Sequence, residues 1–81
     1  MSYTVYIIKS SKDSKRYVGY TENILRRLDE HNNGLVKSTR SRRPLELIYN
    51  EEFENKADAF AREKFFKSGK GREYLARNDI K

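Results

Sequence analysis

Two tyrosines, an arginine and a glutamate in this sequence have the chemistry that phosphodiester hydrolysis requires. Tyr6 and Tyr17 each stand in a short apolar segment, and Arg27 follows ten residues after Tyr17. A phenol can position water or accept its proton, and a guanidinium is a permanent cation whose planar fork matches a phosphate. A carboxylate such as that of Glu63 can hold a divalent ion. These residue types predict an active site at which water attacks a phosphodiester.

The polar run between the two tyrosines predicts a hairpin turn. With the turn centred between Ser11 and Lys12, Tyr6 and Tyr17 lie opposite each other on two antiparallel strands. Gly19, near the end of the second strand, indicates a close approach of the backbone or a bulge. We therefore expect the two phenols to stand side by side.

The segments that must position these residues predict an α+β fold. Residues 3–9 are β-branched and aromatic and are apolar at almost every position, which is typical of a central strand. Further strands are predicted over residues 16–20 and 45–53, and helices over 21–31, 56–67 and 72–77. The expected fold is a small three-stranded, mainly antiparallel sheet flanked by helices, in the order β-β-α-β-α-α.

The first predicted helix has Thr21 as its N-cap and ends before a glycine. At helical spacing, Arg27 and His31 share the face that carries the apolar residues of this helix. Arg26 points the other way and is expected to form a surface ion pair.

The second predicted helix is expected to bury a stripe of small and aromatic residues. Its members are Ala57, Phe60, Ala61 and Phe65. Glu63 lies at the margin of this stripe, where it can reach the edge of a cleft. The spacing of Phe60, Phe65 and Phe66 follows the helix face and assigns them to the core instead of to a base-stacking surface.

One small domain, comprising residues 1–81, is all that this chain length allows. The absence of cysteine removes disulfides and thiolate zinc sites and favours a reducing compartment, which we expect to be the cytoplasm. We expect no leader peptide and no association with a membrane, since no apolar run is long enough to cross one. The net charge of +6 favours a polyanionic partner, most simply nucleic acid.

Two basic segments could contact a nucleic-acid backbone. The first is a polar loop closed by Pro44, and the second surrounds a glycine-rich break before the last helix. Their candidate phosphate-binding residues are Lys37, Arg40, Arg42 and Arg43 in the first segment and Lys67, Lys70 and Arg72 in the second. A solvated loop explains the first group of charges equally well, and a helix-ending turn explains the glycines equally well.

Several motifs, taken in order, resemble those of the GIY-YIG nuclease superfamily over nearly the whole chain. They are Thr4-Val5-Tyr6, Tyr17-Val18-Gly19, the segment from Asn23 through His31 to Gly34, and Ala61-Arg62-Glu63-Lys64. The chain is most similar to small stand-alone proteins of an uncharacterised group, which are related to the N-terminal nuclease domain of the bacterial excision-repair incision subunit. The resemblance implies a three-stranded antiparallel sheet with the site on one side.

The resemblance also implies a role for each site residue. Tyr6 and Tyr17 match the tyrosines of the two motifs, with Tyr6 the expected base and Tyr17 the residue that orients water. Arg27 matches an arginine that stabilises phosphate charge. Glu63 matches a glutamate that binds one divalent ion, Mg²⁺ or Mn²⁺. His31 matches a histidine that some members carry.

Two positions depart from the family pattern. Thr4 replaces a glycine, and a β-branched residue suits a strand. Tyr20 stands where some members carry a lysine next to the scissile phosphate. Any contribution of Tyr20 to nucleic-acid binding would therefore come from hydrogen bonding.

Three functional hypotheses follow from the sequence. In the first, the protein is a metal-dependent endonuclease that acts on DNA with little sequence specificity. In the second, it is a basic nucleic-acid-binding or partner-docking module whose catalysis is weak or lost. The combination of Tyr6, Tyr17, Arg27 and Glu63 favours the first, because a carboxylate repels phosphate and a pure binder has no use for it. The third, an interaction protein without a nucleic-acid partner, leaves the concentrated positive charge unexplained.

Overall fold

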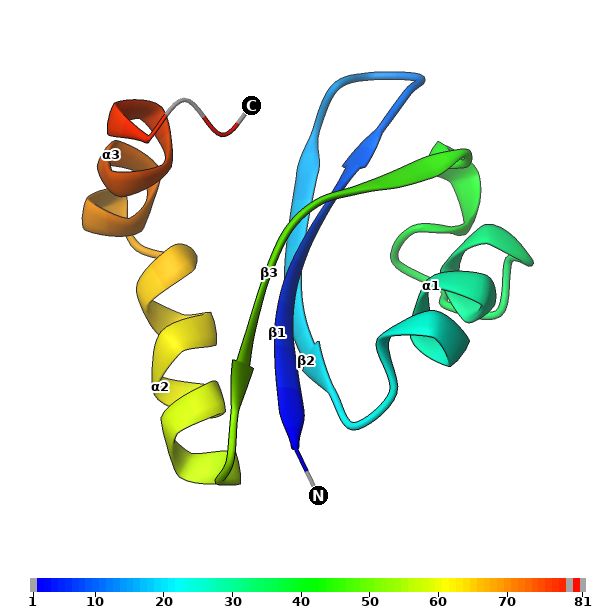
Figure 1. Cartoon of the computed structure of the whole chain (residues 1–81). Coiled ribbons are helices and arrows are strands. Elements are labelled where there is room, and N and C mark those ends of the chain that lie inside the picture. The colour runs from blue at the N-terminus through cyan, green and yellow to red at the C-terminus, as the bar shows by residue number, and fades with distance from the viewer. Residues whose placement is uncertain (1, 79, 81) are drawn as a thin grey trace.

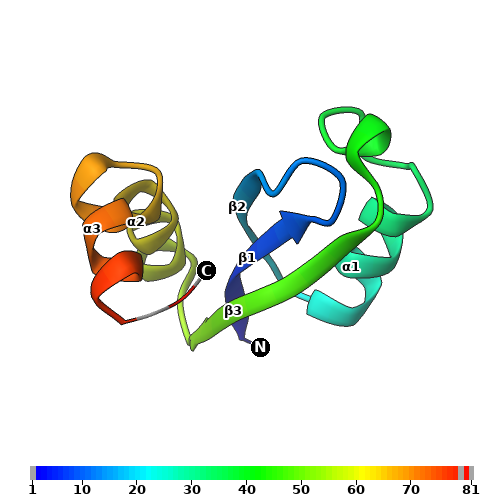
Figure 2. The same ribbon diagram turned by 90° about the horizontal axis from the view of Figure 1, so that it is seen from above.

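A three-stranded antiparallel sheet in the order β2-β1-β3 separates two helical layers in the computed structural model, which describes residues 2–78 and residue 80. The elements are β1 (Tyr3–Ser10), β2 (Arg16–Thr21), α1 (Ile24–Asn32), a 3₁₀ turn (Arg40–Arg42), β3 (Leu45–Phe53), α2 (Lys56–Phe66) and α3 (Gly69–Arg77). Helix α1 covers one face of the sheet, and α2 and α3 cover the other (Figure 1). The view from above shows the same layers (Figure 2). The predicted α+β class and order of elements are confirmed.

The central strand β1 is buried on both faces, as its apolar sequence predicts. Val5 and Ile7 point toward α2 and α3, whereas Tyr6 and Ile8 point toward α1. Val5, Ile7 and Ile8 have no exposed surface at all. Because side chains alternate along a strand, Tyr6 can meet other groups only on the α1 side of the sheet.

The hairpin between β1 and β2 has a different register from the predicted one. Tyr6 pairs with Gly19, and Tyr17 pairs with Ile8. The Ser10 hydroxyl accepts hydrogen bonds from the backbone amides of two turn residues. These contacts fix the centre of the turn one residue later than predicted. Such a shift moves every pair by two positions. The prediction that Tyr6 and Tyr17 lie directly opposite each other is therefore wrong, although both remain on one face.

Helix α1 begins later than predicted, because Asn23 and not Thr21 is its N-cap. The Asn23 side chain accepts a hydrogen bond from the Arg26 amide at 3.0 Å. Strand β2 continues through Thr21, which leaves no helical turn for that residue to cap. The helix ends as predicted before Gly34, whose φ of 77° is easily adopted by glycine.

Helix α2 buries a different face from the predicted one. The expected core residues that are exposed are Ala57, Phe60 and Ala61. The buried residues are Ala59 and Phe66, and Glu63 lies between them on the same side of the helix. Phe60 is 44% exposed and contacts Tyr20 in an edge-on manner, so its assignment to the core is wrong.

An inward-pointing cation explains why the pattern of α2 was misleading. The Arg62 Nε donates to Oε1 of Glu51, on β3, at 2.8 Å. The guanidinium carbon also lies 4.6 to 4.8 Å from the ring centres of Phe65, Phe66 and Tyr74. An arginine can bury its stem and stack its planar head on aromatic rings. The packed side of α2 therefore includes an arginine, whereas a hydrophobic pattern assigns only apolar residues to that side.

Helix α3 starts before the predicted residue 72, and the glycine-rich break is its first turn. Ser68 is the N-cap, and its Oγ accepts a hydrogen bond from the Gly71 amide at 3.2 Å. Gly71 is buried, and a Cβ there would collide with the carbonyl oxygen of Phe65. Close packing of α3 on the end of α2 therefore accounts for this glycine. Within the described part of the chain, no helix is long and apolar enough to cross a membrane.

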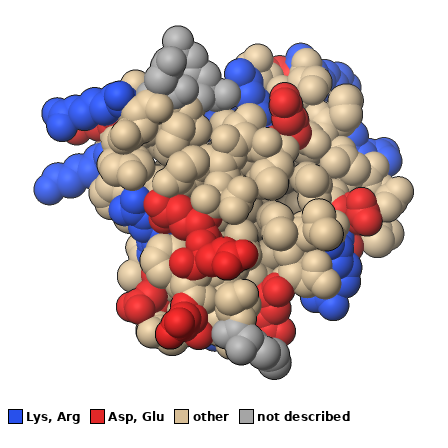
Figure 3. All heavy atoms as spheres, in the orientation of Figure 1, with Lys and Arg blue, Asp and Glu red and all other residues tan. Residues whose placement is uncertain are grey.

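Charge is unevenly distributed over the molecule. The segment from β3 to residue 55 carries no lysine or arginine, and its acidic residues are Glu46, Glu51, Glu52 and Glu54. In the view toward β3, carboxylates gather over its end and the start of α2, while lysines and arginines lie at the sides (Figure 3). The edge of the sheet formed by β3 is therefore unfavourable for a polyanion.

Candidate active site

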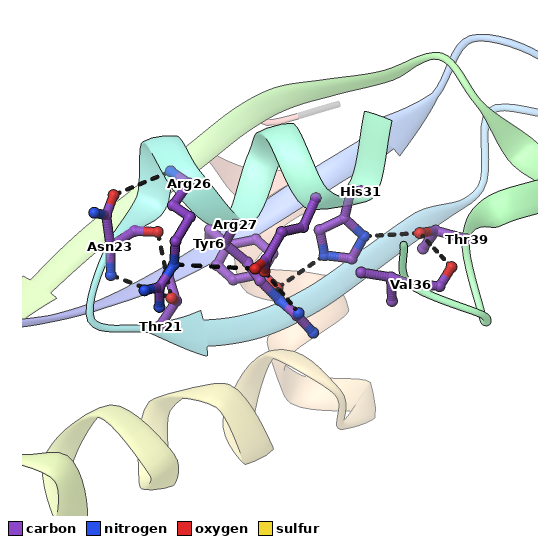
Figure 4. A network of polar contacts seen from close by, with 9 residues as sticks. Tyr6, Thr21, Asn23, Arg26, Arg27, His31, Val36 and Thr39 are labelled. Atoms are coloured by element: carbon purple, nitrogen blue, oxygen red, sulfur yellow. Dashed lines mark hydrogen bonds and ion pairs between the residues drawn. The ribbon is translucent and has the colours of Figure 1, made fainter. Parts of the chain in front are cut away.

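Tyr6 is the centre of a hydrogen-bonded group on the α1 side of the sheet (Figure 4). Its side chain is nearly buried, and its hydroxyl lies 3.1 Å from Nε2 of His31 and 3.4 Å from Nε of Arg27. Three residues singled out from the sequence therefore meet. Strand β1 supplies the phenol, and successive turns of α1 supply the cation and the imidazole.

Gly19 makes room for the Tyr6 phenol. The two residues are direct partners across β1 and β2, and a Cβ on Gly19 would stand 2.6 Å from the phenol oxygen. Carbon and oxygen atoms that are not bonded do not approach so closely, so a larger residue would push the phenol away from its partners. The close approach predicted at Gly19 is confirmed, and its reason is the space that Tyr6 requires.

Arg27 supplies a fixed positive charge next to the phenol. Its Nε donates to the Tyr6 oxygen, and its Nη1 donates to Oε1 of Glu30 at 3.1 Å. The hydrogen bond to Tyr6 and the interaction with Glu30 raise the pKa of Arg27 further, so the guanidinium stays charged. The side chain is 38% exposed, which leaves N–H groups available to a phosphate oxygen.

His31 is oriented by Thr39, which belongs to the loop after α1. Nδ1 of His31 lies 2.7 Å from Oγ1 of Thr39, and Thr39 is fully buried. The Thr39 hydroxyl can donate to the Val36 carbonyl oxygen at 3.5 Å. On this ground we assign the proton of His31 to Nδ1, which donates it to the Thr39 oxygen. In the assigned tautomer, Nε2 carries no hydrogen and accepts one from the Tyr6 hydroxyl.

The environment of His31 favours its neutral form. Burial, together with the positive charge of Arg27, lowers the pKa of His31 below its usual value, and Glu30 opposes this shift only in part. At neutral pH the imidazole is therefore uncharged and able to take up a proton.

Sequence reasoning missed Thr39. Nothing in a polar, basic loop marks one threonine as buried, and helical or strand periodicity does not extend there. The only available signal was that each ring nitrogen of a buried histidine requires a partner. Thr39 would have been one of several candidates for that role.

Tyr17 lies on the same face as Tyr6 but further along the sheet, opposite Ile8. Its hydroxyl donates to the carbonyl oxygen of Ser38 at 3.1 Å, and the Arg42 guanidinium lies 5.6 Å from its ring centre. Among the described residues, Ser38 is the only hydrogen-bond partner of this hydroxyl. The structure therefore joins Tyr17 to the loop after α1 and not to the Tyr6 group.

Glu63 belongs to the other helical layer. Its side chain is 13% exposed, and one carboxylate oxygen lies 3.6 Å from Nζ of Lys67 on the next turn of α2. The described residues contain no group of three or more histidine, cysteine, aspartate or glutamate side chains that could hold a metal ion. Glu63 is thus a nearly buried carboxylate with one cationic partner, on the face of the sheet opposite to Tyr6. The expectation that all site residues lie on one side of the sheet is therefore wrong.

The remaining residues singled out from the sequence fall into two groups on opposite sides of the sheet. Lys37, Arg40, Arg42 and Arg43 lie in the loop after α1, and Lys67, Lys70 and Arg72 lie where α2 meets α3. Tyr20 packs against the α2 layer, with its ring centre 6.2 Å from that of Phe60. It therefore does not belong to the Tyr6 group.

Comparisons with known proteins agree with this architecture. The sequence matches the GIY-YIG catalytic domain family over residues 2–75. It is 48% identical to a UPF0213 protein of Clostridium perfringens over 64 residues, which are 78% of this chain and 68% of that protein. A UPF0213 protein of Staphylococcus saprophyticus is 45% identical over 60 residues, which are 73% and 72% of the two chains. The solution NMR structure of a UPF0213 protein from Bacillus halodurans superposes with a TM-score of 0.60 at 32% identity, covering 99% of this chain and 87% of that one.

Proposed function

The chain belongs to the GIY-YIG catalytic domain family, and on this basis we propose that it is a metal-dependent endonuclease that hydrolyses DNA with little sequence specificity of its own. The observation that carries the proposal is the contact of the Tyr6 hydroxyl with both Arg27 and His31. A phenol held between a fixed cation and a neutral imidazole is arranged to exchange a proton. A tyrosine with only a structural role needs a single partner for its hydroxyl.

In the proposed reaction, Tyr6 assists the attack of water on phosphorus. As the new P–O bond forms, the water proton moves to the Tyr6 oxygen, and the Tyr6 proton moves to Nε2 of His31. The bond to the leaving oxygen breaks, and that oxygen takes a proton from solvent. Arg27 stabilises the negative charge that develops on the phosphate oxygens. Tyr17 is proposed to orient the water with its hydroxyl.

Glu63 is the proposed ligand for one Mg²⁺ or Mn²⁺ ion. A single carboxylate, completed by phosphate and water oxygens, is a usual way in which Mg²⁺ is held. The nearly buried Glu63 carboxylate fits this pattern, and Lys67 would leave it when the ion binds. When bound, a divalent ion neutralises the phosphate as a Lewis acid.

One observation favours a second function, that of a nucleic-acid-binding or partner-docking module. Glu63 is already paired with Lys67 and lies in the layer opposite to Tyr6. A carboxylate that serves only stability would be placed in the same way. A protein of this kind would bind nucleic acid without cleaving it.

A cleavage assay distinguishes the two functions. Branched, nicked, single-stranded and duplex DNA are incubated with the protein and Mg²⁺ or Mn²⁺, and each reaction is repeated with a chelator. We expect Tyr6→Phe, Arg27→Ala and Glu63→Gln each to lower the rate by about 100-fold or more. Arg26→Ala, which removes the neighbouring exposed arginine, is the matched control and should cleave like the parent.

Three results would decide the matter. Cleavage that survives all three substitutions would exclude these residues as the catalytic group. Cleavage that is unaffected by the chelator would exclude the metal. Binding by the parent without cleavage under any condition would establish the second function in place of the first.

A further inference from the structure

We propose that a groove along the outer edge of β2 binds the sugar-phosphate backbone of a nucleic-acid strand beside the candidate active site. The groove has a volume of about 840 Å³. Its charged lining residues are Lys15, Arg16, Arg42, Lys67 and Arg72, and no described aspartate or glutamate lines it. The inference rests on the proposed function for the identity of the polyanion, while the groove itself comes from the geometry of the chain.

The groove joins the two layers of the molecule around one edge of the sheet. Tyr17 and Arg42 line it from the α1 side, and Lys67 and Arg72 line it from the corner between α2 and α3. The two basic segments of the sequence therefore contribute to one surface. Because Tyr17 also shares a sheet face with Tyr6, a strand lying in the groove continues toward the Tyr6 group.

The cations of the groove are available to a ligand. Among residues 2–78 and 80, the Lys15 and Arg72 side chains have no ion-pair or hydrogen-bond partner, and both are exposed. Arg42 and Lys67 each have a carboxylate only at 3.6 Å, in Asp13 and Glu63 respectively. Partly exposed pairs at such distances contribute little stability, so exchanging the carboxylate for a phosphate costs little.

The position of β2 adds uncharged donors to the same surface. Strand β2 is at the edge of the sheet, and an edge strand turns alternate backbone N–H groups outward. Backbone amides are common ligands of nucleic-acid phosphates, together with lysine and arginine. Strand β3, at the opposite edge, contains glutamates and no lysine or arginine, and among the described residues only its Glu51 is paired with a cation, Arg62 of α2 (Figure 3). A strand of nucleic acid is therefore attracted to one edge of the sheet and repelled from the other.

A binding experiment with matched charge changes tests the groove. Affinity for labelled single-stranded and duplex DNA is measured by fluorescence anisotropy in a Tyr6→Phe background, with a chelator present so that nothing is cleaved. The groove variant is Lys15→Gln/Arg72→Gln. The control is Lys56→Gln/Lys64→Gln, which removes the same charge from exposed positions of α2 outside the groove.

We expect the groove variant to bind at least about 10-fold more weakly, with the slope of log affinity against log salt concentration reduced by about 1 to 2. The control should change affinity by less than about 3-fold and leave the slope nearly unchanged. Equal losses in both variants would mean that only net charge matters, and would overturn the groove. Absence of binding by the parent would also overturn it.

The outcome is separable from that of the cleavage assay. If the groove variant binds weakly but the parent never cleaves, the groove is supported and the endonuclease proposal fails. If the parent cleaves and the groove variant binds and cleaves as the parent does, the endonuclease proposal holds and the groove is wrong. Circular dichroism and thermal unfolding of each variant confirm that the exposed substitutions leave the fold intact.

Discussion

The buried Thr39 hydroxyl orients His31, so its removal should disturb the candidate site without changing any group that faces solvent. Thr39→Val keeps the shape of the side chain but removes the acceptor for Nδ1 of His31. We expect the free energy of unfolding to fall by about 1–3 kcal/mol, because a buried imidazole N–H loses its partner. Thr39→Ser keeps the hydroxyl and should lose less. Urea unfolding of the three proteins measures this, and equal stability of Thr39→Val and the parent would exclude the hydrogen bond.

His31 should make stability depend on pH in a range where no other side chain ordinarily titrates, because it is the only histidine of the chain. Burial lowers the pKa of His31 in the folded protein below that of a free histidine, about 6.5. The unfolded chain therefore takes up a proton at higher pH than the folded one. The stabilising contribution of neutral His31 is complete above about pH 6.5 and declines as the pH falls below it.

The measurement is urea unfolding of the parent and of His31→Asn at several values between about pH 5 and 7.5. The parent should lose stability toward the acidic end, and the variant should lose less. If both proteins show the same dependence on pH, the folded-state pKa of His31 is not lowered.

At the scale of residues, sequence reasoning identified side chains better than it identified their partners. Arg27 and His31 were placed on the correct face because helical spacing determines that face directly. The predicted pairing of Tyr17 with Tyr6 was wrong, because it depended on the register of the hairpin. The contacts of Ser10 in the turn set that register. Thr39 was not found, because its burial follows from how a loop folds back onto α1.

Two glycines in the first turn of α3 separate the effect of packing from that of helix propensity. Alanine has a higher helix propensity than glycine, so propensity alone predicts that replacing either glycine by alanine stabilises the protein. A Cβ at Gly71 would overlap the carbonyl oxygen of Phe65, whereas nothing lies within 4 Å of a Cβ at Gly69. We expect Gly71→Ala to lower the unfolding free energy by about 1–3 kcal/mol. Gly69→Ala should raise it by up to about 1 kcal/mol.

Thermal or urea unfolding of the two single variants checks these opposite signs. The Gly69 variant is the internal control, since both glycines lie in the same turn. If both variants are more stable than the parent, the close contact between α3 and the end of α2 does not constrain the fold.

At the scale of elements, the bounds of a strand were predicted correctly where its apolar and polar residues alternate clearly. Strand β3 has the predicted bounds, because its alternation is clear and Pro44 precedes it. The buried face of α2 was wrong because Arg62 packs inward against aromatic rings. The start of α3 was wrong because two glycines, which usually end a helix, lie inside its first turn. In α2 and in α3, tertiary contacts outweighed the local structural preference of the sequence.

At the scale of the whole molecule, the sheet divides the candidate site between two layers. The Tyr6 group lies in the α1 layer and Glu63 in the α2 layer, so a substrate that reaches both has to pass the edge formed by β2. Sequence spacing could name these residues, but it could not assign them to faces before the strand order was known. The groove could not be predicted from the sequence either, because only the fold brings its two basic segments together.

Both layers depend on β1, and we therefore expect them to unfold together. Ile7 is fully buried on the α2 side of this strand, and Tyr6 faces the other side. Ile7→Val removes one methylene group and should lower the unfolding free energy by about 0.5–1.5 kcal/mol. Because β1 pairs with both other strands, this loss should also appear in the α1 layer, which the mutation does not touch.

Native-state hydrogen exchange measures the loss separately for the two layers. The slowest amides of α1 and of α2 should show the same decrease in Ile7→Val, because both exchange through global unfolding. Ile8→Val, which changes the other face of β1, is the matched control and should give the same equality. If α1 keeps the protection of the parent while α2 loses it in Ile7→Val, the layers unfold independently. In that case β1 does not couple the Tyr6 group to Glu63, and a site that spans both layers would lack a rigid frame.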